Sequence, residues 1–138
     1  MRILGVDPGR RRIGLAISDP SGTLARPLRT LAVDGGGVDD VLREIGRLAA
    51  EEEGLAAIVV GVPRRLDGSA TDETERAQAF IDALRSRTAI LIVAGDERLT
   101  SREAESRLAV RDRNWRTRKA RLDSAAAAII LQDYLDHR

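Results

Sequence analysis

The sequence predicts an α/β domain with a five-stranded mixed sheet and helices on both faces. Strand patterns at residues 2–7, 13–18 and 23–32 are separated by the turn sequences DPGRR and DPSG, which predicts an antiparallel meander. Helix and strand patterns alternate after the meander, which favours parallel strands joined by helical crossovers. A length of 138 residues is typical of one domain, so we expect residues 1–138 to form a single unit.

The alternating part begins with residues 38–49, whose apolar side chains recur at helical spacing. Residues 56–62, AAIVVGV, form a continuous apolar run, which is typical of a central parallel strand that is covered on both faces. The pair Ser69 and Asp72 resembles a capping box, so we expect the next helix to begin there. Residues 89–94, AILIVA, are predicted to form the fifth strand.

Two further helices are expected on either side of a loop. Thr100 and Glu103 form a capping box in LTSREAE, which predicts a helix that continues to about residue 110. Residues 111–121 show no apolar periodicity, and we expect a mobile loop. A helix is predicted from Asp123 onward, and because its start is apolar nearly all round, it should pack on the sheet.

Charge is unevenly distributed, although the formal net charge is only +1. The segment 111–121 contains one acidic residue, Asp112, and six basic ones: Arg111, Arg113, Arg116, Arg118, Lys119 and Arg121. This makes it a candidate for phosphate contacts. The absence of cysteine excludes disulfides and thiolate chemistry, and no apolar run approaches the roughly 20 residues of a membrane span. We therefore expect a soluble, cytoplasmic protein with no membrane partner.

The first candidate site residue is Asp7, at the carboxyl end of the first strand. Strand alternation places it on the same face as Ile3 and Gly5. Open α/β sheets tend to bind ligands at this edge. Taken alone, however, Asp-Pro-Gly is the composition of an ordinary turn, and that interpretation is the more common one.

Two other segments carry acids next to predicted helix starts. Asp96 and Glu97 follow the fifth strand, where an acid is favoured by the helix dipole, but Thr100 already caps that helix. Asp123, taken alone, is most simply an N-cap residue. If the segments of Asp7, Glu97 and Asp123 converge at one edge of the sheet, their carboxylates could share hard cations such as Mg²⁺.

No other catalytic pattern competes with these acids. The single histidine, His137, is the penultimate residue, which makes a Ser-His-Asp triad improbable. Neither GxxxxGK[ST] nor GxGxxG occurs, so a P-loop and a dinucleotide-binding fingerprint are both absent.

Four sequence blocks together resemble a known family. They are GVDPGRRRIGLAISD at 5–19, VVGVPRRLDGS at 59–69, DERLTSREAE at 96–105 and KARLDSAAAAIILQDYL at 119–135. These look like the signature blocks of the YqgF (RuvX) family of Holliday junction resolvases, also described as pre-16S ribosomal RNA nucleases. The resemblance spans nearly the whole chain and implies an RNase H-like fold.

The resemblance also implies a site. Asp7, Glu97 and Asp123 match the three carboxylates that are thought to hold divalent metal ions, Mg²⁺ or Mn²⁺, in this fold. Arg98, Thr100 and Lys119 match further positions near that site. The chain departs from the family where a glycine-containing stretch is expected before the lysine, since RDRNWRTRKAR stands there instead. This departure leaves the conformation of that segment open.

The expected chemistry is metal-assisted hydrolysis of a phosphodiester, with two ions roughly 4 Å apart and no histidine base. Basic residues would hold the phosphate backbone without reading its sequence. The residues expected to bind nucleic acid are Arg10, Arg11, Arg12, Arg64, Arg65, Arg98, Thr100, Arg116, Arg118 and Lys119. For any single arginine, a solvated surface position is the competing interpretation.

Several functions remain open at this point. We favour a nuclease that matures the 5′ end of pre-16S rRNA, with ribosomal particles as possible partners. A Holliday junction resolvase is the alternative, and because it cuts opposing strands it would need a symmetric pair of sites, whereas an rRNA nuclease could be a monomer or a homodimer. A non-catalytic nucleic-acid-binding factor would keep the arginines without metal dependence. An actin-like or sugar-kinase-like ATPase would need a second domain, for which 138 residues leave no room.

Overall fold

The computed structural model describes residues 1–96 and 115–138, with the side chains of the second range described from residue 122. The strands are β1 (Arg2–Pro8), β2 (Arg12–Ser18), β3 (Ala25–Ala32), β4 (Leu55–Val62) and β5 (Leu91–Asp96). The helices are α1 (Val38–Ala50), α2 (Asp72–Arg85) and α4 (Trp115–His137). The helix expected over residues 100–110 lies outside the described residues.

The five strands form one mixed sheet in the order β3-β2-β1-β4-β5. The pairs β1–β2 and β2–β3 are antiparallel, and β4 pairs in parallel with β1 on one side and with β5 on the other. The predicted meander and the predicted central parallel strand are therefore both confirmed. Since β1, β4 and β5 run in the same direction, their carboxyl ends lie at one edge of the sheet.

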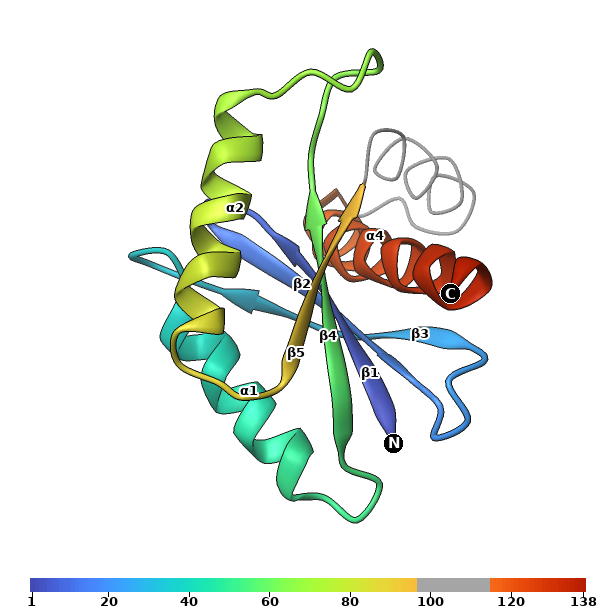
Figure 1. The fold of residues 1–138 in the computed structure, drawn as a ribbon. Coiled ribbons are helices and arrows are strands. Elements are labelled where there is room, and N and C mark those ends of the chain that lie inside the picture. The colour runs from blue at the N-terminus through green and yellow to red at the C-terminus, as the bar shows by residue number, and fades with distance from the viewer. Residues whose placement is uncertain (97–114) are drawn as a thin grey trace.

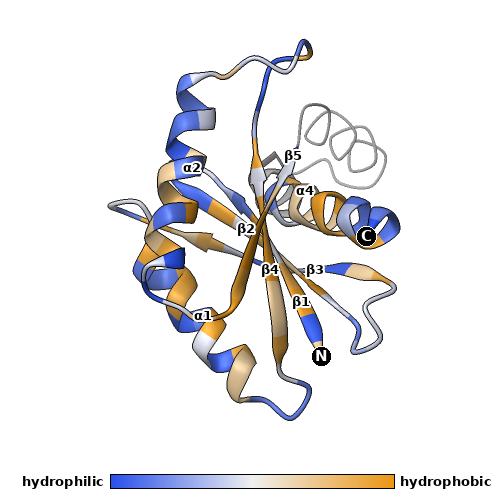
Figure 2. Ribbon diagram, viewed as in Figure 1, coloured by the Kyte–Doolittle hydropathy of each residue, from blue (hydrophilic) through white to orange (hydrophobic). Residues whose placement is uncertain are grey.

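Helices cover both faces of this sheet, as the sequence predicts (Figure 1). One face packs under α4, where Ala127 and Leu131 meet Ile3 and Val59. The opposite face packs under α1 and α2 and holds the larger apolar cluster, which includes Leu4 and other fully buried strand residues. Figure 2 shows the central strands in the colours of hydrophobic residues, between the two helical layers. Among the described residues, no helix is long and apolar enough to span a membrane.

The start of α2 differs from the sequence prediction. The N-cap is Thr71, whose backbone is extended (φ −122°, ψ 177°) and whose hydroxyl accepts a hydrogen bond from the Thr74 backbone N–H at 3.2 Å. The Thr74 hydroxyl in turn accepts from the Thr71 N–H at 2.8 Å, which completes a capping box. Ser69 instead donates its backbone N–H to Asp67, so it belongs to the preceding turn. The predicted box at Ser69 and Asp72 is thus wrong, because Thr and Thr serve as a capping pair in place of the usual Ser and Glu.

The start of α4 also differs. This helix begins at Trp115, so the loop predicted for 111–121 is wrong from residue 115 onward. Residues 116–121 are mostly Arg, Lys and Ala, which are strong helix formers. Absence of apolar periodicity shows only that a helix has no apolar stripe to bury, and does not by itself indicate a loop.

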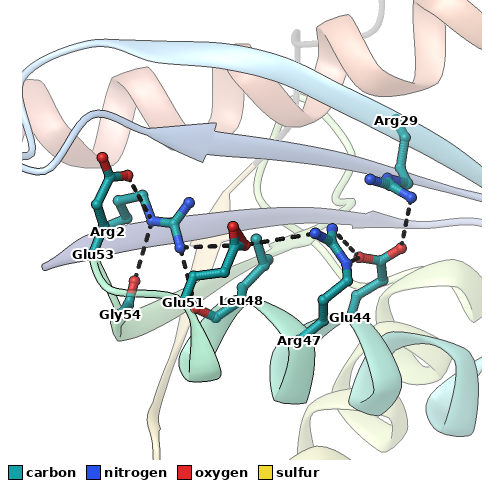
Figure 3. Close-up of polar contacts among 8 residues, drawn as sticks. All are labelled: Arg2, Arg29, Glu44, Arg47, Leu48, Glu51, Glu53 and Gly54. Carbon is teal, nitrogen blue, oxygen red and sulfur yellow. Dashed lines mark hydrogen bonds and ion pairs between the residues drawn. The ribbon is translucent and has the colours of Figure 1, made fainter.

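A buried arginine ties the start of β1 to the end of α1. The Arg2 side chain is only 9% exposed and donates to the backbone carbonyls of Leu48 at 3.1 Å and Gly54 at 3.2 Å (Figure 3). Glu51 and Glu53 lie 3.6 and 3.5 Å from the same guanidinium. The carbonyl of Leu48 also accepts from the backbone N–H of Glu51 at 3.2 Å, so Arg2 is its second donor at the end of the helix. They also fix the connection from α1 into β4.

Candidate active site at the carboxyl edge of the sheet

Asp7 lies half-buried near the end of β1, opposite Gly14 of β2 in the antiparallel register. It shares its face of the sheet with Gly5, where an added Cβ would lie 2.8 Å from the Cβ of Leu131 in α4. The face predicted for Asp7 is therefore the one that α4 covers.

Helix α4 crosses this hairpin at the partner of Asp7. A Cβ on Gly14 would lie 1.9 Å from the carbonyl oxygen of Asp123 and 2.3 Å from its carbonyl carbon. Such distances mean that the helix backbone rests directly on the strand backbone, which only glycine permits. Two of the three predicted carboxylate positions, Asp7 and Asp123, are thereby brought together from distant parts of the chain.

The structure excludes the cap interpretation of Asp123. Since α4 begins at Trp115, Asp123 lies within the helix rather than at its start. Its Oδ2 accepts a hydrogen bond from Nε of Arg12 at 2.7 Å, and both side chains are partly buried, with exposed fractions of 26% and 34%. The sequence predicts Arg12 as a phosphate contact, but in the structure its guanidinium is hydrogen-bonded to Asp123, a predicted metal ligand.

The third segment of the predicted site is β5. Asp96 ends this strand in register with Val62 of β4, which places it at the same edge as Asp7. Strand alternation puts Gly95 on the α4 face, since a Cβ there would lie 3.1 Å from Ile130, and it puts Asp96 on the other face. The predicted third carboxylate, Glu97, lies outside the described residues.

Among the residues that the structure describes, no three His, Cys, Asp or Glu side chains gather as a metal site. The described part of the candidate site contributes the carboxylates of Asp7 and Asp123. Oxygen donors of this kind are the ligands that Mg²⁺ and Mn²⁺ favour. The donor chemistry of these two residues therefore fits a hard divalent ion.

The predicted phosphate-binding arginines have different surroundings. Arg11 and Arg65 are exposed, whereas Arg10 pairs with Glu73 at 3.0 Å. Arg64 is half-buried and donates to the carbonyl of Gly68 at 3.4 Å, so it also closes its own loop. Three further predicted contacts, Arg116, Arg118 and Lys119, fall in the first turns of α4, of which only the backbone is described. Arg98 and Thr100 lie outside the described residues.

The arginines of the β1–β2 turn and the carboxylate of Asp123 lie around one surface hollow of about 380 Å³. It is lined by Gly9, Arg10, Arg11, Arg12 and Asp123, and we call it the Asp123 hollow. Three arginines and one carboxylate line the hollow, and since Glu73 pairs with Arg10 and Asp123 pairs with Arg12, the charge that favours a phosphate here is that of the exposed Arg11. Glu73, which the sequence did not indicate, balances Arg10 from outside the hollow. Its only sequence signal is its position three residues before Arg76 on the predicted helix.

Comparisons with known proteins bear on this arrangement. A family model described as RuvX, Holliday junction resolvase, matches residues 1–137. A protein of Pelotomaculum thermopropionicum is 40% identical over 136 residues, which covers 99% of this chain and 87% of that protein. A protein of Geobacillus kaustophilus is 37% identical over 138 residues, and the match covers 100% of this chain and 99% of that protein. Both carry the name "Putative pre-16S rRNA nuclease".

Solved structures show the same fold. The Thermus thermophilus RuvC structure has a TM-score of 0.52 at 14% identity and covers 98% of this chain and 94% of its own. The Fowlpox virus resolvase, solved with Holliday junction DNA, has a TM-score of 0.57 at 11% identity, and the match covers 99% of this chain and 97% of the resolvase chain. At these identities the likeness concerns the fold alone, and it confirms the RNase H-like fold that the sequence predicts.

Proposed function

The chain belongs to the RuvX family, and on that premise we propose that it is a metal-dependent nuclease that matures the 5′ end of pre-16S rRNA. This family membership confirms the resemblance that the four sequence blocks indicate. The observation that carries the proposal is the contact of α4 with Gly14, since it brings Asp123 to the strand residue that is paired with Asp7.

The proposed metal ligands are Asp7, Glu97 and Asp123. Bound Mg²⁺ or Mn²⁺ would activate a water molecule and stabilise the leaving 3′-oxygen of the phosphodiester. The protein's own task is to hold the carboxylates in place. Gly14 allows the close approach of the helix, and Arg12 restrains the side chain of Asp123 through its 2.7 Å hydrogen bond.

The arginines of the hairpin are proposed to hold the substrate. Arg10, Arg11 and Arg12 line the Asp123 hollow, so a phosphate that enters it meets guanidinium groups next to the carboxylate. Contacts of this type position the backbone and carry no sequence information. Sequence preference must then come from elsewhere on the surface. The additional contacts that we propose are Arg98, Thr100 and the basic residues of the segment 111–121, which include Lys119.

Two substrates remain under this proposal, and the names of the curated relatives favour pre-16S rRNA. We propose that its partners are ribosomal particles in the cytoplasm. The second candidate is a Holliday junction, because the family model carries that description and the fold neighbours are resolvases. Cutting opposing strands of a junction requires two symmetric sites, so this candidate also requires a homodimer.

The test is cleavage of pre-16S RNA and of a four-way DNA junction, side by side, by purified protein with Mn²⁺. We expect Asp7→Asn to lower the cleavage rate by more than about 100-fold, because an amide is a poor substitute for an anionic metal ligand. The control is Asp82→Asn, which changes an exposed carboxylate on α2 and should leave the rate unaltered. Full activity of the Asp7→Asn protein, or equal cleavage in excess EDTA, would overturn the proposal.

A further inference from the structure

A second hollow, of about 320 Å³, lies on the other side of the β1–β2 turn from Asp123. Its walls are largely apolar and come from three segments: Pro8 and Gly9 in the turn, Val38 at the start of α1, and Ala77, Ala79 and Phe80 on α2. We call it the Phe80 hollow. Phe80 is the single phenylalanine of the chain and is 7% exposed.

The mouth of the Phe80 hollow is charged. Arg10 donates from Nη2 and Nε to Oε1 of Glu73, at 3.0 and 3.2 Å, and Arg76 donates to the same oxygen. Among the residues that line this hollow, two guanidinium groups share one carboxylate, so the lining itself carries one positive charge in excess. An apolar hollow with a cationic rim suits a ligand that joins an apolar ring to an anion.

The two hollows share a wall. Gly9 and Arg10 line both the Asp123 hollow and the Phe80 hollow, so the turn forms a ridge between them. A nucleic-acid strand that places a phosphate on the Asp123 side therefore has the Phe80 hollow within reach of the adjoining nucleotide. Arg10, at the ridge, can contact the backbone that crosses it.

We propose that the Phe80 hollow binds the base of an unpaired nucleotide next to the phosphate that is cut. This rests on the proposed nuclease function. The flat faces of bases are apolar and are commonly held against apolar and aromatic side chains, whereas a base within a duplex is already stacked and paired. The hollow therefore selects a single-stranded or splayed nucleotide and lets the enzyme distinguish it from intact duplex.

The test fills the hollow without touching the carboxylates. Ala79 is exposed at the wall, so Ala79→Phe should occupy the space and leave the fold intact, and Ala49→Phe on the exposed side of α1 is the matched control. Both proteins are assayed on the RNA substrate, and on the same RNA with an abasic nucleotide beside the cut position. We expect Ala79→Phe to lower kcat/KM about tenfold on intact RNA, since one lost base contact is worth about this much.

The abasic RNA shows whether Ala79→Phe acts by blocking a base pocket or by a general loss of activity. It should be cut about tenfold less well by the unaltered protein, with no further loss in Ala79→Phe, because the contact is already absent. Equal losses for Ala79→Phe on both RNAs, or no loss on either, would overturn the proposal.

A binding measurement keeps this proposal separate from the nuclease function. In the Asp7→Asn background, Ala79→Phe should weaken binding of a single-stranded RNA about tenfold, measured by fluorescence anisotropy, and should leave binding of a fully paired duplex unchanged. If Asp7→Asn and the double variant with Ala79→Phe bind the single strand with equal affinity, the proposed base pocket is contradicted. This holds whether or not cleavage is observed. Absence of cleavage by the unaltered protein, with the binding difference present, contradicts only the nuclease function.

Discussion

Arg12 at the start of β2 and Asp123 within α4 are joined by a 2.7 Å hydrogen bond between Nε and Oδ2. The bond connects a strand near the beginning of the sequence to the helix near its end. Because both side chains are partly buried, the pair is shielded from water more than a surface ion pair. It restrains a proposed metal ligand and attaches α4 to the hairpin.

Arg12→Gln should lower the free energy of unfolding by about 1 kcal/mol, since a charge-assisted hydrogen bond at a half-buried position is lost. Urea denaturation followed by circular dichroism measures this. Arg11→Gln is the control, because the neighbouring side chain is exposed, and its effect should stay within about 0.5 kcal/mol. Equal stability of the two variants would show that the Arg12–Asp123 bond contributes nothing to the fold.

Gly14→Ala should destabilise the protein by about 1–3 kcal/mol, because its Cβ would collide with the backbone of Asp123 and force α4 away from the sheet. The contrasting variant is Gly46→Ala in α1, where an added Cβ meets nothing within 4 Å. Alanine there should stabilise the helix by about 0.5–1 kcal/mol. We expect the urea midpoint to fall for Gly14→Ala and to rise for Gly46→Ala. A stable, fully active Gly14→Ala protein would contradict the close approach of α4 to β2.

Arg2→Ala should cost about 2 kcal/mol, since two buried hydrogen bonds from the guanidinium are lost, although the Leu48 carbonyl keeps its bond from the Glu51 N–H. Arg47→Ala provides the comparison. Arg47 pairs with Glu44 one helical turn away and is exposed, so its loss should cost no more than about 0.5 kcal/mol (Figure 3). Similar costs for the two variants would mean that burial of Arg2 adds nothing.

Asp19 in the β2–β3 turn should titrate at low pH. A hydrogen bond from the Ser21 hydroxyl, followed by bonds from the backbone N–H groups of Leu24 and Thr23, lowers the pKa of this carboxyl to about 2 from 3.8. Since the folded-state pKa is the lower one, the stabilisation is complete above about pH 4 and is lost as the pH falls towards 2. NMR titration of the Asp19 carboxyl gives the midpoint directly.

The matched variant for this turn is Asp19→Asn, which copies the protonated acid. The stability difference between Asp19→Asn and the unaltered protein should be largest above pH 4 and should shrink as the pH approaches 2. A difference that stays constant over this range would show that the carboxylate charge is not what the turn uses.

The strands and the packing of the sheet were predictable because they are local or periodic features. The run AAIVVGV identifies β4, and the turns around Gly9 and Gly22 divide the meander. The start of α4 was not predictable in this way, since a helix turn without an apolar stripe leaves no periodic signal. Propensity for the helical state was the better guide there.

The carboxylates proposed for the site are predicted from sequence, but the contacts of Asp123 could not be predicted in that way. Asp123 looks like a cap as long as the helix is thought to begin beside it, and only the longer α4 shows otherwise. The bond from Arg12 and the fit of α4 over Gly14 join residues far apart in sequence, which no local pattern records. The roles of Asp7, Glu97 and Asp123 as metal ligands stay predictions.

The contact between Gly14 and Asp123 also sets an order of events during synthesis. The ribosome releases the hairpin with Asp7 and its arginines long before α4 has been made. An unfinished chain therefore already has the arginines of the hairpin, but it lacks Asp123, the last of the three proposed carboxylates. If the proposed function is correct, the active site is assembled only when α4 docks, so a nascent chain has no nuclease activity before its last helix is made.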